Sequence, residues 1–109
     1  ITIYQITVSN EEVDDINAGK SVPKFETKRN LMFNASEKFE AEMFEFYTPV
    51  FTVYTDNLEE AFEVTNLWND ESLVVRVSEN GCSSSVGDIF EKDGKFFMVD
   101  SFGFGEVAV

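Results

Sequence analysis

The carboxylates are the side chains of this sequence whose number and spacing point most clearly to a chemical role. Between positions 34 and 63 they are opposed by a single base, Lys38. Acids three or four positions apart on a helix lie ~5–6 Å apart on its surface, and Glu42 with Glu45 and Glu59 with Glu63 have that spacing. The acids of this stretch are Glu37, Glu40, Glu42, Glu45, Asp56, Glu59, Glu60 and Glu63.

Rows of carboxylates can imitate the phosphates of duplex DNA, which follow one another every ~3.4 Å of axis on each strand. We therefore expect a surface that occupies the basic groove of a nucleic-acid-binding enzyme, as an inhibitor that mimics DNA. Phe44 lies among the acids and could anchor such an interface, although an aromatic residue so placed more often contacts a neighbouring strand. The alternative is that the acidic faces only keep the domain soluble. The expected partner-binding residues are Glu37, Glu40, Glu42, Glu45, Glu59, Glu60, Glu63 and Phe44.

The overall charge also favours a basic protein as the partner. The 109 residues include 21 acidic and 8 basic ones, for a net charge of -13. Nucleic acids and anionic lipids repel such a chain, so we expect neither to bind directly. No apolar run is long enough to span a membrane, and no signal peptide opens the sequence. We therefore expect a cytoplasmic protein, and its oligomeric state stays open.

Several kinds of catalytic site are excluded by composition. The chain has no histidine, which excludes imidazole acid–base catalysis and histidine metal ligands. Its single cysteine, Cys82, cannot form an internal disulfide or a thiolate zinc site. Paired carboxylates can serve glycosidases and metal-dependent nucleases, but the adjacent pair Glu59 and Glu60 would diverge on a helix. We expect a non-enzymatic protein without cofactor or metal.

Three predicted helices would position the acids. Residues 10–17 follow a capping box of Ser9 and Glu12, in which each side chain satisfies a backbone N–H, and we expect Val13 and Ile16 to point inward. Residues 57–68 form another predicted helix, with Asp56 as its cap. Its glutamates share one face, and a stripe for packing lies on the other, formed by Leu58, Ala61, Phe62 and Thr65. A third helix is predicted over 34–47, because apolar residues recur there at the spacing of a buried stripe. That stripe consists of Phe39, Met43, Phe46 and Tyr47.

The remaining segments are predicted to form a sheet. Asp93-Gly94 lies between two short apolar runs, which is the strongest short signal for a β-hairpin. We read residues 20–33 as a loop that leads into one strand. The bases of this segment are expected to pair with carboxylates of this chain or of a symmetry mate; they are Lys20, Lys24, Lys28 and Arg29. The polar loop 78–85 should be the most mobile part. Besides the strand within 20–33, the predicted strands cover 1–8, 50–55, 73–77, 89–91, 95–99 and 106–109.

The C-terminal third carries a distinctive pattern. It reads Ser84-Ser85-Val86-Gly87-Asp88-Ile89, then Asp93-Gly94-Lys95, then Val99-Asp100-Ser101-Phe102-Gly103-Phe104. This pattern resembles the signature of small YodL-like proteins. The resemblance covers residues 84–104 and implies a bacteriophage, plasmid or conjugative element as the genetic setting, without implying an activity. It also implies that the cytoplasm in which the protein acts is that of a bacterial host.

The same motif has two physical interpretations. In the first, Gly87 permits a sharp turn and Asp88 accepts backbone N–H bonds there, so that the motif only holds the hairpin together. In the second, the loop 83–88 and Asp100-Ser101 line a binding groove. An accessory role in assembly is the alternative to DNA mimicry, with the aromatic C-terminal hairpin as the contact surface.

We expect a single α+β domain over 1–109. It should consist of an antiparallel twisted sheet with two or three short helices on one side and a C-terminal β-hairpin.

Overall fold

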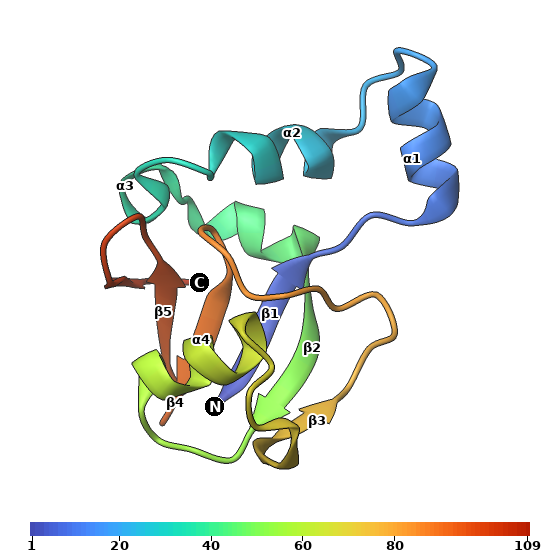
Figure 1. Cartoon of the computed structure of the whole chain (residues 1–109). Coiled ribbons are helices and arrows are strands. Elements are labelled where there is room, and N and C mark those ends of the chain that lie inside the picture. Colours follow the sequence, from blue (N-terminus) through green and yellow to red (C-terminus); the bar gives the residue numbers. More distant parts are fainter.

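A six-stranded antiparallel sheet forms the centre of the protein, as seen in a computed structural model that describes residues 1–109 (Figure 1). The strand order is β3-β2-β1-β4-β5-β6. The predicted α+β class and the C-terminal hairpin are therefore confirmed. The strands are β1 (Thr2–Ile6), β2 (Tyr47–Val53), β3 (Val74–Arg76), β4 (Ile89–Lys92), β5 (Lys95–Val99) and β6 (Phe104–Val107). The β4–β5 turn places Asp93 and Gly94 at positive φ, as its Asp-Gly sequence predicts.

Four α-helices and two 3-10 helices connect the strands. The α-helices are α1 (Asn10–Asn17), α2 (Pro23–Asn30), α3 (Ala35–Lys38) and α4 (Leu58–Asn66). The 3-10 helices are η1 (Ala41–Phe46) and η2 (Glu71–Leu73). None of these helices has both the length and the apolar character needed to cross a bilayer.

The helices cover both faces of the sheet, and not one face as predicted. Ile3 pairs with Phe51 on one side and Phe90 on the other, and this face packs against Ala61 and Val64 of α4. Because side chains alternate along a strand, the next residues point to the opposite face. There Ile6, Ile89 and Met98 pack with Leu31 and Ala35, which α2 and α3 bring to the sheet.

Residues 23–30 are helical, so the prediction of a loop and strand over 20–33 is wrong. Pro23 is the first residue of α2, a position where its fixed φ and missing N–H suit a helix. Glu26 lies in the first turn, and Lys28 and Arg29 lie in the last turn, where they complement the helix dipole. These signals were present in the sequence, but the weak alternation of Lys24 to Lys28 obscured them.

The helix predicted over 34–47 is interrupted. The chain is helical over α3, extended at Phe39 and Glu40, and helical again over η1. Tyr47 then begins β2 and pairs with Ile6, so the chain must leave the helix to reach the sheet. The predicted stripe still faces inward, since Phe39, Met43 and Phe46 pack against the Tyr47 side of the core.

Helix α1 forms where it is predicted, but its packing differs. Its capping box is present, with the Glu12 N–H donating to Ser9 Oγ and the Ser9 N–H donating to Glu12 Oε1. The helix projects from the sheet (Figure 1) and contains no buried residue. Val13 is 42% exposed, so the expectation that it points into the core is wrong.

Candidate functional site

The seven predicted partner-binding glutamates all lie on the surface. Each is exposed, and none takes part in an ion pair. The two ion pairs of the structure join Lys24 to Glu12 (2.7 Å) and Lys20 to Asp15 (3.5 Å). The prediction that the bases of 20–29 pair with the chain's own acids therefore holds for two of the four, since Lys28 donates to the Ile6 carbonyl oxygen instead and Arg29 lies over the ring of Phe25. The glutamates are Glu37, Glu40, Glu42, Glu45, Glu59, Glu60 and Glu63.

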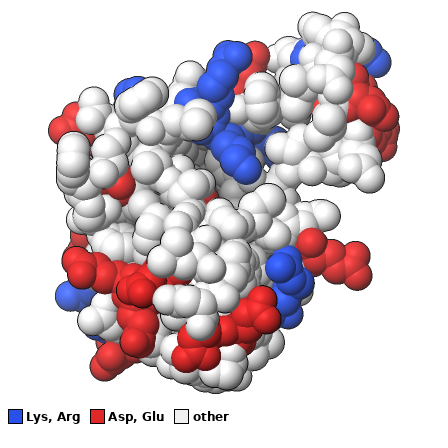
Figure 2. Space-filling view, in the orientation of Figure 1, with Lys and Arg blue, Asp and Glu red and all other residues white.

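The fold distributes these glutamates over two sides of the sheet. Glu59, Glu60 and Glu63 belong to α4, which packs on the Ile3 face. Figure 2 shows acidic side chains gathered at the level where Figure 1 places this helix. The acids of 40–45 accompany η1, whose apolar side chains pack on the opposite face. The eight predicted residues therefore do not form one continuous lattice.

Phe44 is not an exposed anchor. Its ring is half-buried and lies 5.2 Å from the ring of Tyr4 and 5.5 Å from that of Phe96, centroid to centroid. It also stacks on Tyr47 at 6.1 Å. The side chain therefore packs against the core on the Ile6 face of the sheet, so its inclusion among the partner-binding residues is corrected to a packing role.

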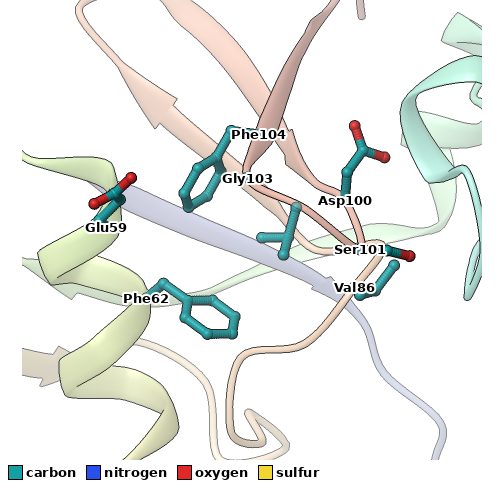
Figure 3. Close-up of a pocket in the computed structure, with 8 residues that line it drawn as sticks. Glu59, Phe62, Val86, Asp100, Ser101, Gly103 and Phe104 are labelled. Atoms are coloured by element: carbon teal, nitrogen blue, oxygen red, sulfur yellow. The ribbon is translucent and has the colours of Figure 1, made fainter.

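A cavity lies between α4 and the turn that joins β5 to β6 (Figure 3). Its volume is about 290 Å³, close to the lower end of the ~300–1,000 Å³ typical of ligand pockets. The rings of Phe62 and Phe104 approach it from two elements, and Glu59 lies at its rim (Figure 3). The lining residues are Glu59, Phe62, Val86, Val99, Asp100, Ser101, Gly103 and Phe104.

The surface is hollowed on both sides of this cavity. A wider depression shares Glu59 and Phe104 with it and extends to Asp56 at the start of α4, where Lys92 also contributes to the wall. A second depression shares Asp100 and Ser101 with it. This one is lined further by Asn34, Ser36, Glu37 and Phe102. Because neighbouring depressions share wall residues, they adjoin one another. We name the three together the α4–turn groove, which extends from Asp56, across the β5–β6 turn, to Glu37.

The loop before β4 supplies Val86 to this groove and is firmly held. The amide of Gln5 donates from Nε2 to the Cys82 carbonyl oxygen (2.8 Å), and the Cys82 N–H donates to Gln5 Oε1 (2.9 Å). Ser84 is buried, and its hydroxyl lies 2.6 Å from that of Thr65 on α4. The prediction that 78–85 is the most mobile segment therefore conflicts with the packing of its C-terminal part.

Asp88 is the buried acid at the end of this loop. Its Oδ2 accepts hydrogen bonds from Gln5 Nε2 (2.9 Å) and from the Ser85 N–H (3.0 Å). Burial raises the pKa of Asp88 to about 7, against the smaller lowering effects of those two bonds and of the Lys28 charge. The role predicted for Asp88 as an acceptor of backbone N–H bonds is confirmed, and Gly87 before it has the positive φ that the turn requires (94°).

Asp100 fixes the other wall of the groove. Its Oδ1 accepts the Ser36 N–H (2.9 Å), and its Oδ2 accepts the Ser36 hydroxyl (2.6 Å). These bonds tie the β5–β6 turn to the first turn of α3. The carboxylate is therefore directed toward α3 and away from the cavity (Figure 3), so its contribution to the groove is its negative charge.

The groove has the chemistry of a binding surface for cations with an apolar stem. Phe62 was not predicted as a site residue, because its position in the apolar stripe of α4 indicates only packing. Gln5 was missed as well, since nothing near it in sequence marks it as the support of a loop that lies 77 positions further on.

No group of three or more potential ligands is arranged to hold a metal ion. No known protein family, curated protein or solved structure matches the chain.

Proposed function

We propose that this protein is a non-enzymatic binding protein that attaches to a basic protein surface through the acids of α4 and blocks that surface. The supporting observation is that Glu59, Glu60 and Glu63 are exposed and free of ion pairs on one short helix. Unpaired like charges repel one another in the free protein, and lysines and arginines of a partner would relieve that repulsion. In its most specific form, the proposal is that α4 occupies the DNA site of a nucleic-acid-binding enzyme.

A charge-reversal variant tests this proposal. Glu59→Lys combined with Glu63→Lys should abolish capture of basic proteins from a bacterial extract, whereas the wild type should retain them at low salt and release them as salt rises. Added duplex DNA should compete with the wild type if the occupied surface is a DNA site. Glu40→Lys with Glu42→Lys is a matched control with the same change in net charge on the η1 side. Normal binding by the α4 variant would refute the proposal.

An accessory role in assembly is the second candidate, because one aromatic side chain is fully offered to solvent. Phe102 is 97% exposed at the tip of the β5–β6 turn. Phe104 is less available, since its ring lies 5.4 Å from that of Phe90 in the core. In this case Phe102→Ala should lose the partner while the α4 charge reversal keeps it.

The genetic setting is also a proposal. The resemblance of residues 84–104 to YodL-like proteins favours a bacteriophage or another mobile element as the source. Within such an element, a small acidic protein that blocks a basic surface of the host would act without any cofactor.

A further inference from the structure

We propose that the α4–turn groove is a binding site for an extended basic peptide segment, whose central arginine side chain enters the cavity between Phe62 and Phe104. This inference rests on the proposed function, because it specifies how the basic partner is recognised. It adds a site, a ligand chemistry and a set of residues that surface charge alone does not provide.

The cavity suits the stem of a long side chain. Its interior is apolar, with Phe62, Val86, Val99 and Phe104 in its walls, and its volume of about 290 Å³ is too small for a folded element of a partner. Arginine and lysine bury their aliphatic stems against apolar surface while the charged end stays near polar groups. A single such side chain is therefore the occupant that matches both the size and the walls.

The charges around the cavity select a cation. Glu59 lies at the rim and has no ion pair, so its carboxylate is free to accept hydrogen bonds from a ligand. Asp100 lies at the opposite wall and adds negative charge, although both of its oxygens are already bonded to Ser36. The single base along the groove, Lys92, lies at the Asp56 end and outside the central cavity.

The aromatic walls favour arginine over lysine. A planar guanidinium stacks on an aromatic face and can donate two parallel hydrogen bonds to one carboxylate, whereas an ammonium group is a compact and strongly hydrated charge. Phe62 and Phe104 direct their rings into the cavity beside Glu59 (Figure 3). The same opening therefore offers a stacking surface and a carboxylate to one guanidinium.

The groove continues far enough for neighbouring residues of the same segment. On one side it reaches Asp56, and on the other it passes Phe102 and reaches Glu37. Basic residues that flank the central arginine would meet these two acids, and the exposed ring of Phe102 would lie against the bound backbone or a flanking side chain. We assign an extended conformation to this segment, because an extended chain reaches furthest per residue and the groove consists of three adjoining depressions.

Peptide binding to the full chain tests the site. The probe is a fluorescein-labelled octapeptide of alternating arginine and serine, measured by fluorescence anisotropy beside the corresponding lysine peptide. The arginine peptide should bind at least about threefold more tightly. Glu59→Gln and Phe62→Leu should each weaken it by about fivefold, as expected for loss of one exposed ion pair or one cation–π contact.

Glu79→Gln is the matched control, because Glu79 is exposed, lies outside the groove and loses the same charge. The proposal is wrong if Glu59→Gln and Glu79→Gln weaken binding equally, since binding would then depend on net charge alone. It is equally wrong if the two peptides bind with the same affinity or if neither binds. Glu59→Gln concerns an exposed side chain, so the test does not depend on whether Phe62→Leu alters the fold.

NMR spectra provide an independent readout. Addition of the arginine peptide should shift the ring protons of Phe62 and Phe104 and leave those of the buried Phe51 unchanged; equal shifts of all three rings would contradict the site. A partner that is lost on charge reversal of α4 but retained in Phe62→Leu would refute the groove and leave the proposed function intact. If both variants still bind the partner, the proposed function is refuted.

Discussion

Gln5 and Asp88 show how two buried polar residues fix a segment that has no regular structure. The Gln5 amide bonds to both the backbone N–H and the carbonyl oxygen of Cys82 and also donates to the Asp88 carboxylate. Asp88 in turn accepts the Ser85 N–H. Because a buried polar group without a partner is costly, this network fixes the loop and thereby the position of Val86 in the groove wall.

The raised pKa of Asp88 predicts a pH-dependent stability. Since the pKa rises from its ordinary value of 3.8 to about 7 in the folded protein, the folded state binds this proton more tightly than the unfolded chain. The contribution to the free energy of unfolding is therefore fully present below pH 3.8 and is lost as the pH rises toward 7. Asp88→Asn removes this titration and should flatten the decline between pH 4 and pH 8.

Chemical denaturation at a series of pH values measures this effect, whose size should be a few kcal/mol at most. Lys28 and Tyr47 are the other titratable groups that act on Asp88, and neither is altered by the substitution. Asp93→Asn, in the exposed β4–β5 turn, is the control and should keep the slope of the wild type. An unchanged slope in Asp88→Asn would show that other groups cause the pH dependence.

The short elements of this fold take their positions from distant residues. Helix α3 has only four residues, which is too few for a helix to be stable in isolation. The side chain of its N-cap residue, Asn34, makes no capping hydrogen bond. Asp100 supplies the acceptor in its place from the β5–β6 turn, so the start of α3 and one wall of the groove depend on the same carboxylate.

Removal of this carboxylate should destabilise the protein. Asp100→Ala leaves the Ser36 N–H without its acceptor and should lower the free energy of unfolding by ~1–3 kcal/mol. Ser36→Ala removes only the hydroxyl bond and should cost ~0.5–1.5 kcal/mol. Urea denaturation of the two single variants and the double variant measures their losses of stability. The loss in the double variant should be clearly smaller than the sum of the two single losses, because both substitutions break the same contact. Ser101→Ala, exposed beside Asp100, should have little effect, and additive losses would contradict the clamp.

The distribution of charge over the protein as a whole is uneven. The net charge is -13, and half of the bases lie in the segment from Lys20 to Arg29, near α2. Figure 2 shows these bases apart from the acids that gather at the level of α4. With two ion pairs in the structure, most of the carboxylates have no basic side chain beside them.

Stability should therefore rise with ionic strength. Raising sodium chloride from about 0.01 to about 1 M shortens the screening length from ~30 to ~3 Å and should raise the melting temperature by several degrees, because repulsion among the carboxylates weakens. Calorimetry or circular dichroism measures the shift. In the double variant Glu59→Lys with Glu63→Lys, each substitution changes the net charge by two positive units. Repulsion among the carboxylates is then weaker, so the rise in melting temperature with salt should be smaller than in the wild type. A melting temperature independent of salt in the wild type would contradict the prediction.

Local patterns in the sequence were sufficient to predict several elements of the fold. The capping box of Ser9 and Glu12, the apolar stripe of α4 and the Asp93-Gly94 turn act over a few residues, so the sequence predicts them without reference to the rest of the chain. The N-cap of α4 is Asn57 and not Asp56, an error of one residue that is usual for helix ends. Acidic, exposed positions on α4 follow from the same local pattern.

The tertiary structure decided the remaining features. The stretch 34–47 has the pattern of one helix, but the chain is extended at Phe39 and Glu40. The helical part then ends where Tyr47 pairs with Ile6, since contacts in the sheet outweigh small helix propensities. Coverage of both faces of the sheet separates the two sets of glutamates. The groove joins residues 56–62 to residues 86–104, because strand order places the β5–β6 turn beside α4. Such proximity depends on long-range packing, which short spacings in a sequence do not encode.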